Sequence, residues 1–88
     1  MMLGQIVLVK RGRDKGSFMV VLGLEEGFVL IADGRRRKLN KPKRKNTRHV
    51  SATKSFISLV PDGGRRLQDA DIRKAIRTFV LKEVTHIV

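Results

Sequence analysis

The sequence predicts a mainly β protein: a small β-barrel with one C-terminal α-helix. Short β-branched and apolar runs separated by glycine-marked turns fill residues 1–60. After a Pro-Asp-Gly-Gly turn at residues 61–64, the apolar spacing changes to the i, i+3/i+4 spacing of a helix. A chain of 88 residues has room for one domain with a modest core. We therefore expect a barrel over residues 1–60 and, over residues 61–88, a turn and an amphipathic helix packed on it.

The first three strands follow from β-branched and apolar runs. Residues 5–10 have the composition of a strand that is buried on both faces. Residues 18–24 (FMVVLGL) and 28–32 (FVLIA) form the second and third strands. Between the first two, residues 12–16 begin and end with glycine, which suits a tight connection that needs positive φ angles.

The later strands are read from turn signals. Asp33-Gly34 is a hairpin signal, so residues 35–39 are expected to pair back as a fourth strand. Pro42 is then expected to end the ladder, because proline has no N–H donor and restricts the residue before it. Residues 48–60 contain enough β-branched and apolar side chains for a fifth strand.

The C-terminal segment reads as an amphipathic helix from Ala70, with Asp69 as its N-cap and Asp71 in its first turn. Its apolar stripe consists of Ile72, Ala75, Ile76, Phe79 and Val80, and the opposite face carries Arg73, Lys74, Arg77 and Lys82. We expect the stripe to pack on the barrel and to close one of its open ends. A helix that binds a partner is the alternative.

The formal net charge of +12 is concentrated in two segments. The first basic segment, residues 10–15 (KRGRDK), carries four cations and one carboxylate. The second basic segment, residues 35–48 (RRRKLNKPKRKNTR), carries nine cations and no acid. In the other 68 residues, seven cations balance seven acids. Such concentration favours neutralisation of a polyanion, of which nucleic acid is the commonest inside cells. A merely solvated surface is the plainer interpretation.

The order of the strands places these segments relative to one another. In a meander, the loop after the first strand and the turn after the third lie at the same end, while the turn after the second lies at the other. We therefore expect the two basic segments to form one patch, and Glu25 and Glu26 to lie away from it.

Other functional classes find little support in the sequence. The chain has no cysteine, and its two histidines, His49 and His86, lie far apart without ligand spacing, so no metal site and no cofactor are expected. The serines and threonines form no catalytic motif, so no enzyme is predicted. The N-terminal apolar stretch is too short for a signal sequence or a membrane span, and we expect a cytoplasmic protein without a membrane or a small-molecule substrate.

The aromatic residues bear on the kind of nucleic acid. All four are phenylalanines, and each falls in an apolar run expected in the core. Single-strand binders usually display aromatic side chains on which bases stack. The composition therefore favours recognition of folded RNA through phosphates and shape. Pro42 keeps the second basic segment extended, so this segment is expected to order on binding.

The residues resemble a known motif. Residues 3–31, with GQIVLVKRGRDKG followed by FMVVLGL, resemble a KOW motif, and Gly16 falls at its characteristic glycine. The continuation FVLIADGRRRKLNKPKRKN and RHVSAT is similar to the KOW-bearing large-subunit ribosomal proteins of archaea and eukaryotes (fourteen-e type) and to their small bacterial relatives. The similarity runs to about Thr53 and extends more weakly to the helix. Ala52 departs from it, since relatives often have proline there, which bears on the path of the fifth strand.

This resemblance implies an SH3-like barrel that binds ribosomal RNA, with the large ribosomal subunit as its partner and a monomer when free. The expected RNA-binding residues are Lys10, Arg11, Arg13, Lys15, Gly16, Arg35, Arg36, Arg37, Lys38, Lys41, Lys43, Arg44, Lys45, Arg48 and His49. His49 is expected to form a structural hydrogen bond or a phosphate contact.

Three other functions stay open on the sequence. A regulatory KOW module would bind RNA polymerase or a nascent transcript. The KPKRK stretch would serve as a nuclear import signal in a cell that has a nucleus. Binding to a membrane surface through the basic face of the helix is the function with the least support, because that face has only four cations and the chain has no tryptophan.

Overall fold

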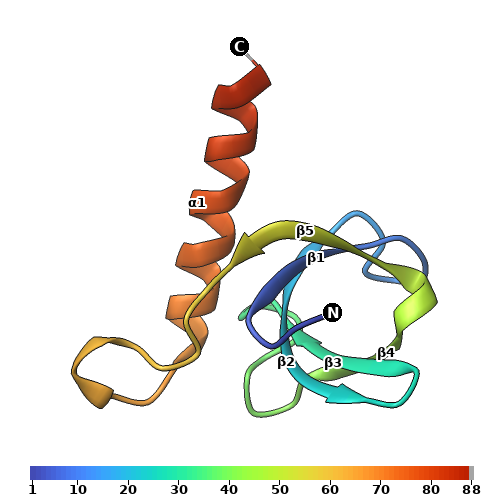
Figure 1. The fold of residues 1–88 in the computed structure, drawn as a ribbon, viewed down its shortest axis with the longest axis horizontal. Helices are drawn as coiled ribbons and strands as arrows, with labels where there is room; N and C mark the ends of the chain where they lie inside the picture. The colour runs from blue at the N-terminus through green and yellow to red at the C-terminus, as the bar shows by residue number, and fades with distance from the viewer. Residues whose placement is uncertain (88) are drawn as a thin grey trace.

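The computed structural model describes residues 1–87, with side chains to residue 83. One antiparallel sheet in the order β4-β3-β2-β1-β5 curls into a small barrel, and one long helix follows it (Figure 1). The elements are β1 (Gln5–Val9), β2 (Phe18–Glu25), β3 (Phe28–Ala32), β4 (Lys43–Asn46), the 3₁₀ turn η1 (Thr47–His49), β5 (Val50–Phe56), the 3₁₀ turn η2 (Asp62–Gly64) and α1 (Asp69–Ile87). The predicted fold class, mainly β with one C-terminal helix, is confirmed.

The central strands bury side chains on both faces, as the composition of the first strand predicts. On the concave face, Val7 lies opposite Met19 across β1 and β2, and Val21 lies opposite Ile31 across β2 and β3. These side chains form a core inside the barrel together with Val9, Val29 and Val50. Because side chains alternate along a strand, the intervening residues form a second apolar row on the convex face.

Helix α1 covers that convex face. Ile6, Val20 and Ala32 form a row across β1, β2 and β3, and Ile72 and Phe79 of the helix pack against it. The Phe79 ring meets the ring of Phe18 edge-on, with centroids 4.9 Å apart. Ile72, Ile76 and Phe79 of the expected apolar stripe pack as predicted, whereas Val80 is exposed. The helix lies beside the barrel and not over an open end (Figure 1). The apolar convex row decides this, because only a second layer can bury it.

The prediction of a fourth strand at residues 35–39 is wrong. The Oδ1 atom of Asp33 accepts hydrogen bonds from the backbone N–H groups of Arg35 and Arg37, which curls the chain into a loop. The fourth strand begins directly after Pro42 and pairs with β3 through the register Ile31↔Lys43 to Phe28↔Asn46. Proline thus precedes an edge strand instead of ending the ladder, a position where its missing N–H costs nothing.

The fifth strand is shorter than predicted. The predicted strand covers residues 48–60, whereas β5 spans Val50–Phe56. Arg48 and His49 belong to η1, which the Oδ1 atom of Asn46 caps by accepting a hydrogen bond from the backbone N–H of Arg48, at 2.9 Å.

The start of α1 differs in its capping. Asp69 is the first helical residue, and its Oδ1 atom accepts a hydrogen bond from the backbone N–H of Leu39, at 2.7 Å, instead of capping the helix. Asp71 supplies the local contact: its Oδ2 atom accepts from the backbone N–H of Gln68, as in one half of a capping box. Among the described residues, no helix has both the length and the apolar character needed to cross a membrane.

Candidate nucleic-acid interface

The first basic segment is held in a compact loop between β1 and β2. The backbone N–H of Lys15 donates to Gly12 O, and that of Gly16 donates to Val9 O, at 3.1 and 2.8 Å. Gly12 and Gly16 adopt φ angles of 91° and 90°, which side chains other than hydrogen strongly disfavour. The sequence expectation for this connection is therefore confirmed. The loop leaves the side chains of Arg11, Arg13 and Lys15 exposed.

A partly buried ion pair connects the two basic segments. The only acid in either segment, Asp14, is buried, and its Oδ2 atom accepts a hydrogen bond from Arg37 Nε at 3.0 Å. The pair neutralises that acid inside the loop, so the exposed side chains around it are cationic. It also confirms that the first segment and the start of the second lie at the same end of the barrel, although 23 residues separate the two partners.

The loop at residues 33–41 is tied to the helix as well as to its own turn. Gly34 has a φ angle of 78° and lies so close to Asp69 O that a Cβ atom would collide with it. Arg73 Nη1 donates a hydrogen bond to Gly34 O at 2.7 Å, and Asp69 accepts from Leu39 at the far side of the loop. These contacts fix the backbone from which the cations project.

The same loop and β4 enclose a hollow of about 480 Å³. Its lining contains six cations and no acid: Arg36, Arg37, Lys38, Lys41, Lys43 and Arg44, together with Asn40 and Pro42. Bidentate guanidinium groups and ammonium groups around an open hollow are the donors that phosphate oxygens accept best. This hollow is therefore a candidate anion site.

The charge separation expected from the strand order holds only in part. Arg44 Nε donates to Glu25 Oε1 at 2.7 Å, and its guanidinium lies 3.6 Å from the centroid of the Phe28 ring. Since β4 runs antiparallel to β3, it carries the end of the second basic segment toward the β2–β3 turn. The prediction that Glu25 lies away from the basic residues is therefore wrong for Arg44.

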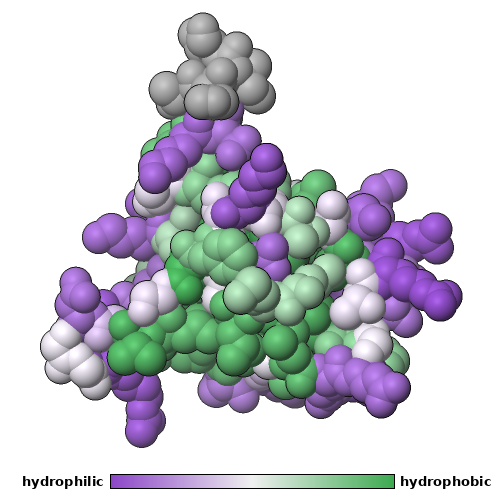
Figure 2. Space-filling model, viewed as in Figure 1, coloured by the Kyte–Doolittle hydropathy of each residue, from purple (hydrophilic) through white to green (hydrophobic). Residues whose placement is uncertain are grey.

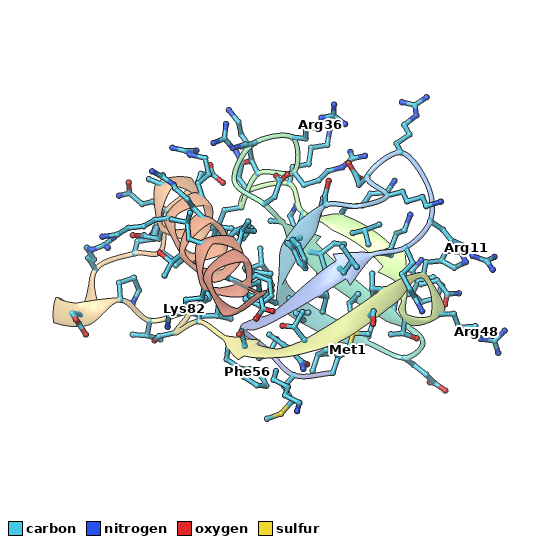
Figure 3. The ribbon with its side chains drawn as sticks, turned by 90° about the horizontal axis from the view of Figure 1, so that it is seen from above. Met1, Arg11, Arg36, Arg48, Phe56 and Lys82 are labelled. Carbon is cyan, nitrogen blue, oxygen red and sulfur yellow. The ribbon has the colours of Figure 1, made fainter. Side chains whose placement is uncertain are left out.

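The remaining candidate residues lie where the barrel closes. The backbone N–H of Lys10 donates to His49 O at 2.8 Å, and the half-buried Lys45 extends its Nζ atom to Gly12. Arg48 is exposed on η1. In Figure 3, Arg36 lies at the top of the view and Arg11 and Arg48 lie at its right, while Met1 and Phe56 lie at the bottom. Most candidate side chains are exposed; Arg37, Lys45 and His49 are partly buried.

Two helix residues join this surface although the sequence did not assign them to it. Arg73 and Arg77 line a second hollow together with Arg35. The sequence signal was present, because the two arginines are four residues apart on one helical face. What the sequence lacked was the contact that brings this face beside the loop at residues 33–41.

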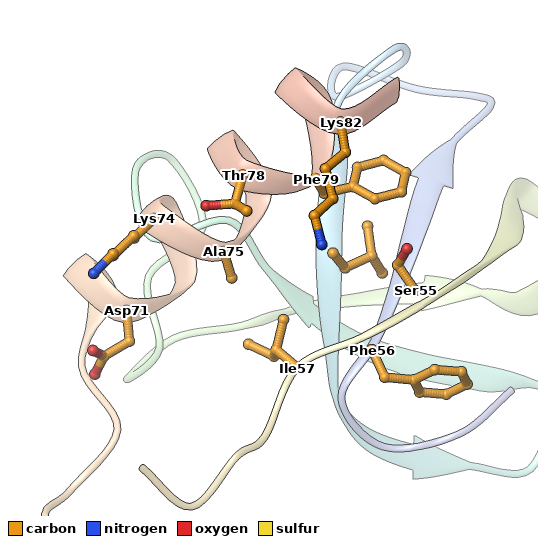
Figure 4. A pocket seen from close by; sticks show the side chains of 10 residues that line it. Ser55, Phe56, Ile57, Asp71, Lys74, Ala75, Thr78, Phe79 and Lys82 are labelled. Carbon is orange, nitrogen blue, oxygen red and sulfur yellow. The ribbon is translucent and has the colours of Figure 1, made fainter. Parts of the chain in front are cut away.

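The other side of α1 has a different character. A groove of about 390 Å³ runs between α1 and the end of β5, with Ile57, Ala75 and Phe79 on its walls and Lys74 and Lys82 among its polar residues (Figure 4). The half-exposed Phe56 and the exposed Met2, Leu3 and Val60 are among the apolar residues of the surface, and Figure 2 shows the apolar area that spreads across one face. Cations are therefore sparser here than around the loop at residues 33–41.

The chain matches no protein-family model and no curated protein. Among the described residues, no three histidine, cysteine, aspartate or glutamate side chains gather as a metal site would require.

Proposed function

We propose that this protein binds structured RNA through the side chains of its two basic segments. The observation that carries the proposal is a hollow whose lining contains six cations and no acid, although Arg37 and Arg44 pair with Asp14 and Glu25 outside it. It lies next to a loop whose only carboxylate is buried and paired. Association of cations with phosphates releases counterions, so such a surface binds a polyanion with a strong dependence on salt.

Folded RNA is the favoured ligand because the cationic surface displays no aromatic platform. Phe28 lies under the Arg44 guanidinium, and Phe18 packs against Phe79. The exposed Phe56 lies on the side away from Arg36 and Arg11 (Figure 3). A rigid cationic surface without stacking rings favours contact with the backbone of a helix or a stem-loop over binding of a flexible single strand.

The partner that fits the resemblance to KOW-bearing ribosomal proteins is ribosomal RNA, and we propose a ribosomal or ribosome-associated role. Such an RNA is folded, dense in phosphate and abundant, and a cation-rich barrel suits it. The proposed location is the cytoplasm, where ribosomes work.

RNA binding is tested by the fluorescence anisotropy of a labelled RNA hairpin, titrated with protein at several salt concentrations. If four to six cations contact phosphates, log K falls against log salt with a slope of about −3 to −5. A slope shallower than about −1 contradicts the proposal. A duplex DNA of the same length reports whether the A-form geometry matters.

The ribosomal role is tested by sedimentation of a cell lysate through sucrose gradients at low and high salt. Co-migration with the large subunit at low salt is the expected result, and retention at high salt would indicate a built-in component. Absence from ribosomal fractions at low salt, with recovery on RNA polymerase, would instead favour a regulatory module that binds polymerase or its transcript.

A further inference from the structure

A hollow of about 330 Å³ lies between α1, the start of β2 and the loop at residues 33–41. It combines two kinds of lining. Arg35, Arg73 and Arg77 supply positive charge, and Phe18, Ile76 and Val80 are apolar. The lining also contains Ser17 and one carboxylate, Asp33, whose Oδ1 atom accepts from the backbone N–H groups of Arg35 and Arg37. A surface that only attracts anions would lack the apolar side chains, and a gap in the hydrophobic core would lack the arginines. A nucleotide does require both: cations for its phosphate and an apolar surface for its ribose and base.

The two walls of the hollow are held in a fixed relation. The hydrogen bond from Arg73 Nη1 to Gly34 O connects the helix to the loop, and Asp69 accepts from Leu39 one turn earlier. Ile72, one residue before Arg73, is fully buried against the sheet. Arg35 and Arg77, which lie 42 positions apart in the chain, therefore project into one hollow from backbone segments that are already fixed, so less backbone ordering is needed on binding.

We propose that this hollow holds one unpaired nucleotide of the bound RNA, with Arg35 and Arg77 on its phosphate and with Ile76 and Val80 under its ribose and base. The inference rests on the proposed RNA binding and adds the helix to the interface. An RNA with a bulged or looped nucleotide therefore binds more tightly than a fully paired duplex with the same number of phosphates.

The first test compares two cations on opposite sides of α1. Arg77→Ala removes a cation from the hollow, whereas Lys74→Ala removes one from the groove beside β5 (Figure 4). Both variants lower the net charge by one. For a labelled RNA hairpin with a single-nucleotide bulge, we expect Arg77→Ala to weaken binding about 5-fold or more and Lys74→Ala less than about 2-fold.

A second test probes the apolar floor. Val80→Glu places a carboxylate in the hollow, and Thr78→Glu places one in the groove on the other side of the helix. Val80 is already 36% exposed, so both variants are expected to keep the fold, which circular dichroism checks. We expect Val80→Glu to weaken binding of the bulged hairpin and to abolish its advantage over the paired duplex, while Thr78→Glu preserves that advantage.

The outcomes separate this inference from the proposed function. The double variant Arg36→Ala/Lys38→Ala tests only the six-cation hollow between the loop at residues 33–41 and β4, because neither residue lines the proposed nucleotide site. If this double variant weakens binding while Arg77→Ala matches Lys74→Ala, RNA binding stands and the nucleotide site is refuted. If neither weakens binding, both are refuted. Crosslinking of a hairpin with 4-thiouridine at the bulge is expected to label Phe18 or residues 76–80, and labelling confined to other residues overturns the site.

Discussion

At the scale of single residues, the burial of Asp14 is the feature that most shapes the basic surface. A carboxylate exposed among arginines and lysines would repel phosphate. Here its side chain is only 5% exposed and is paired with Arg37, whose own side chain is 29% exposed. Arg37 thereby serves first as a positioning residue that joins two loops, and its exposed neighbours are the better candidates for phosphate contact.

Asp14→Ala is expected to weaken RNA binding although it raises the net charge by one, because it releases the loop that Arg37 holds. It should also lower the free energy of unfolding by about 1–3 kcal/mol, since the guanidinium loses its partner. Anisotropy titration and urea unfolding measure the two effects. Glu26→Ala makes the same charge change at an exposed turn and is expected to leave stability nearly unchanged. If both variants bound RNA more tightly than the parent chain, the ion pair would not be needed to position the loop.

A second acidic residue, Asp71, ties the helix start to the preceding loop. The Arg65 guanidinium donates two hydrogen bonds to it, at 2.7 and 2.9 Å, and the backbone N–H of Gln68 donates a third. These bonds, the one from Arg65 first, lower the pKa of Asp71 from 3.8 to about 2. The same pairing raises the pKa of Arg65.

Because its pKa is lower in the folded state, Asp71 stabilises the fold above the unfolded value of 3.8, and this contribution is lost as pH falls from about 4 toward 2. Asp71→Asn should therefore be less stable than the parent chain at pH 7, with a difference that shrinks below pH about 4. Urea unfolding between pH 2 and 7 measures it. A difference that stays constant across this range would contradict the assigned pKa.

At the scale of elements, the contact between the loop at residues 33–41 and α1 carries the largest consequence. Gly34 permits this contact in two ways: it adopts a positive φ angle, and it has no Cβ atom to collide with Asp69 O. The first turn of α1 is thus packed against the loop that bears the densest run of cations. The helix is part of the scaffold of the site and not only a cover for the sheet.

Gly34→Ala tests this contact against a matched glycine. Gly27 has a similar φ angle of 75°, but a Cβ atom there would meet nothing within 4 Å. Gly27→Ala should cost about 1–2 kcal/mol from backbone strain alone. Gly34→Ala should cost about 1–3 kcal/mol more, because the helix start must move, and it should also weaken RNA binding. Equal costs in urea unfolding would refute the close approach.

The packing of α1 on the convex face predicts a second difference. Ile72 is fully buried against the row formed by Ile6, Val20 and Ala32. Ile72→Ala should lower the free energy of unfolding by about 2–5 kcal/mol, since it leaves a cavity between helix and sheet. Val80→Ala, at a site 36% exposed on the same helix, should cost less than about 1 kcal/mol. Urea unfolding of both variants measures these changes. Similar decreases in the free energy of unfolding would mean that the helix is not tightly packed on the sheet.

At the scale of the whole molecule, the surface is divided in character. Cations from the second basic segment and from α1 line the two hollows beside the loop at residues 33–41. The exposed Met1 and Phe56 lie on a different side of the molecule from Arg36 (Figure 3). A protein with this distribution meets a polyanion in a preferred orientation.

Two triple variants with equal charge test that orientation. Arg36, Lys38 and Lys41 line the cationic hollow, while Lys54 is exposed on β5 and Lys74 and Lys82 line the groove behind the helix. Alanine at the first three positions should make the salt slope of RNA binding shallower by about 2–3. Alanine at the second three should change it by less than about 1. Equal changes, measured by anisotropy, would mean that only total charge matters.

Much of this protein is determined by its sequence. The β-branched and apolar composition of residues 5–10 predicted a strand buried on both faces, the spacing from Ile72 to Phe79 predicted a helix with one apolar stripe, and the glycines around the first basic segment predicted a tight loop. These features depend on periodicity and backbone preference, which act within a few residues. The concentration of charge is likewise visible without a structure.

Only the tertiary structure decided where the fourth strand lies, which face of the barrel the helix covers, and which cations meet. The Asp33-Gly34 signal predicted a hairpin, but the side chain of Asp33 bonded the loop instead, and the strand formed after Pro42, where β3 offered a free edge. Asp14 and Arg37, which form an ion pair, lie 23 positions apart, and Arg35 and Arg77, which line one hollow, lie 42 positions apart. Such pairs follow from how strands align and how helix and sheet bury their apolar rows, and local sequence does not encode that geometry.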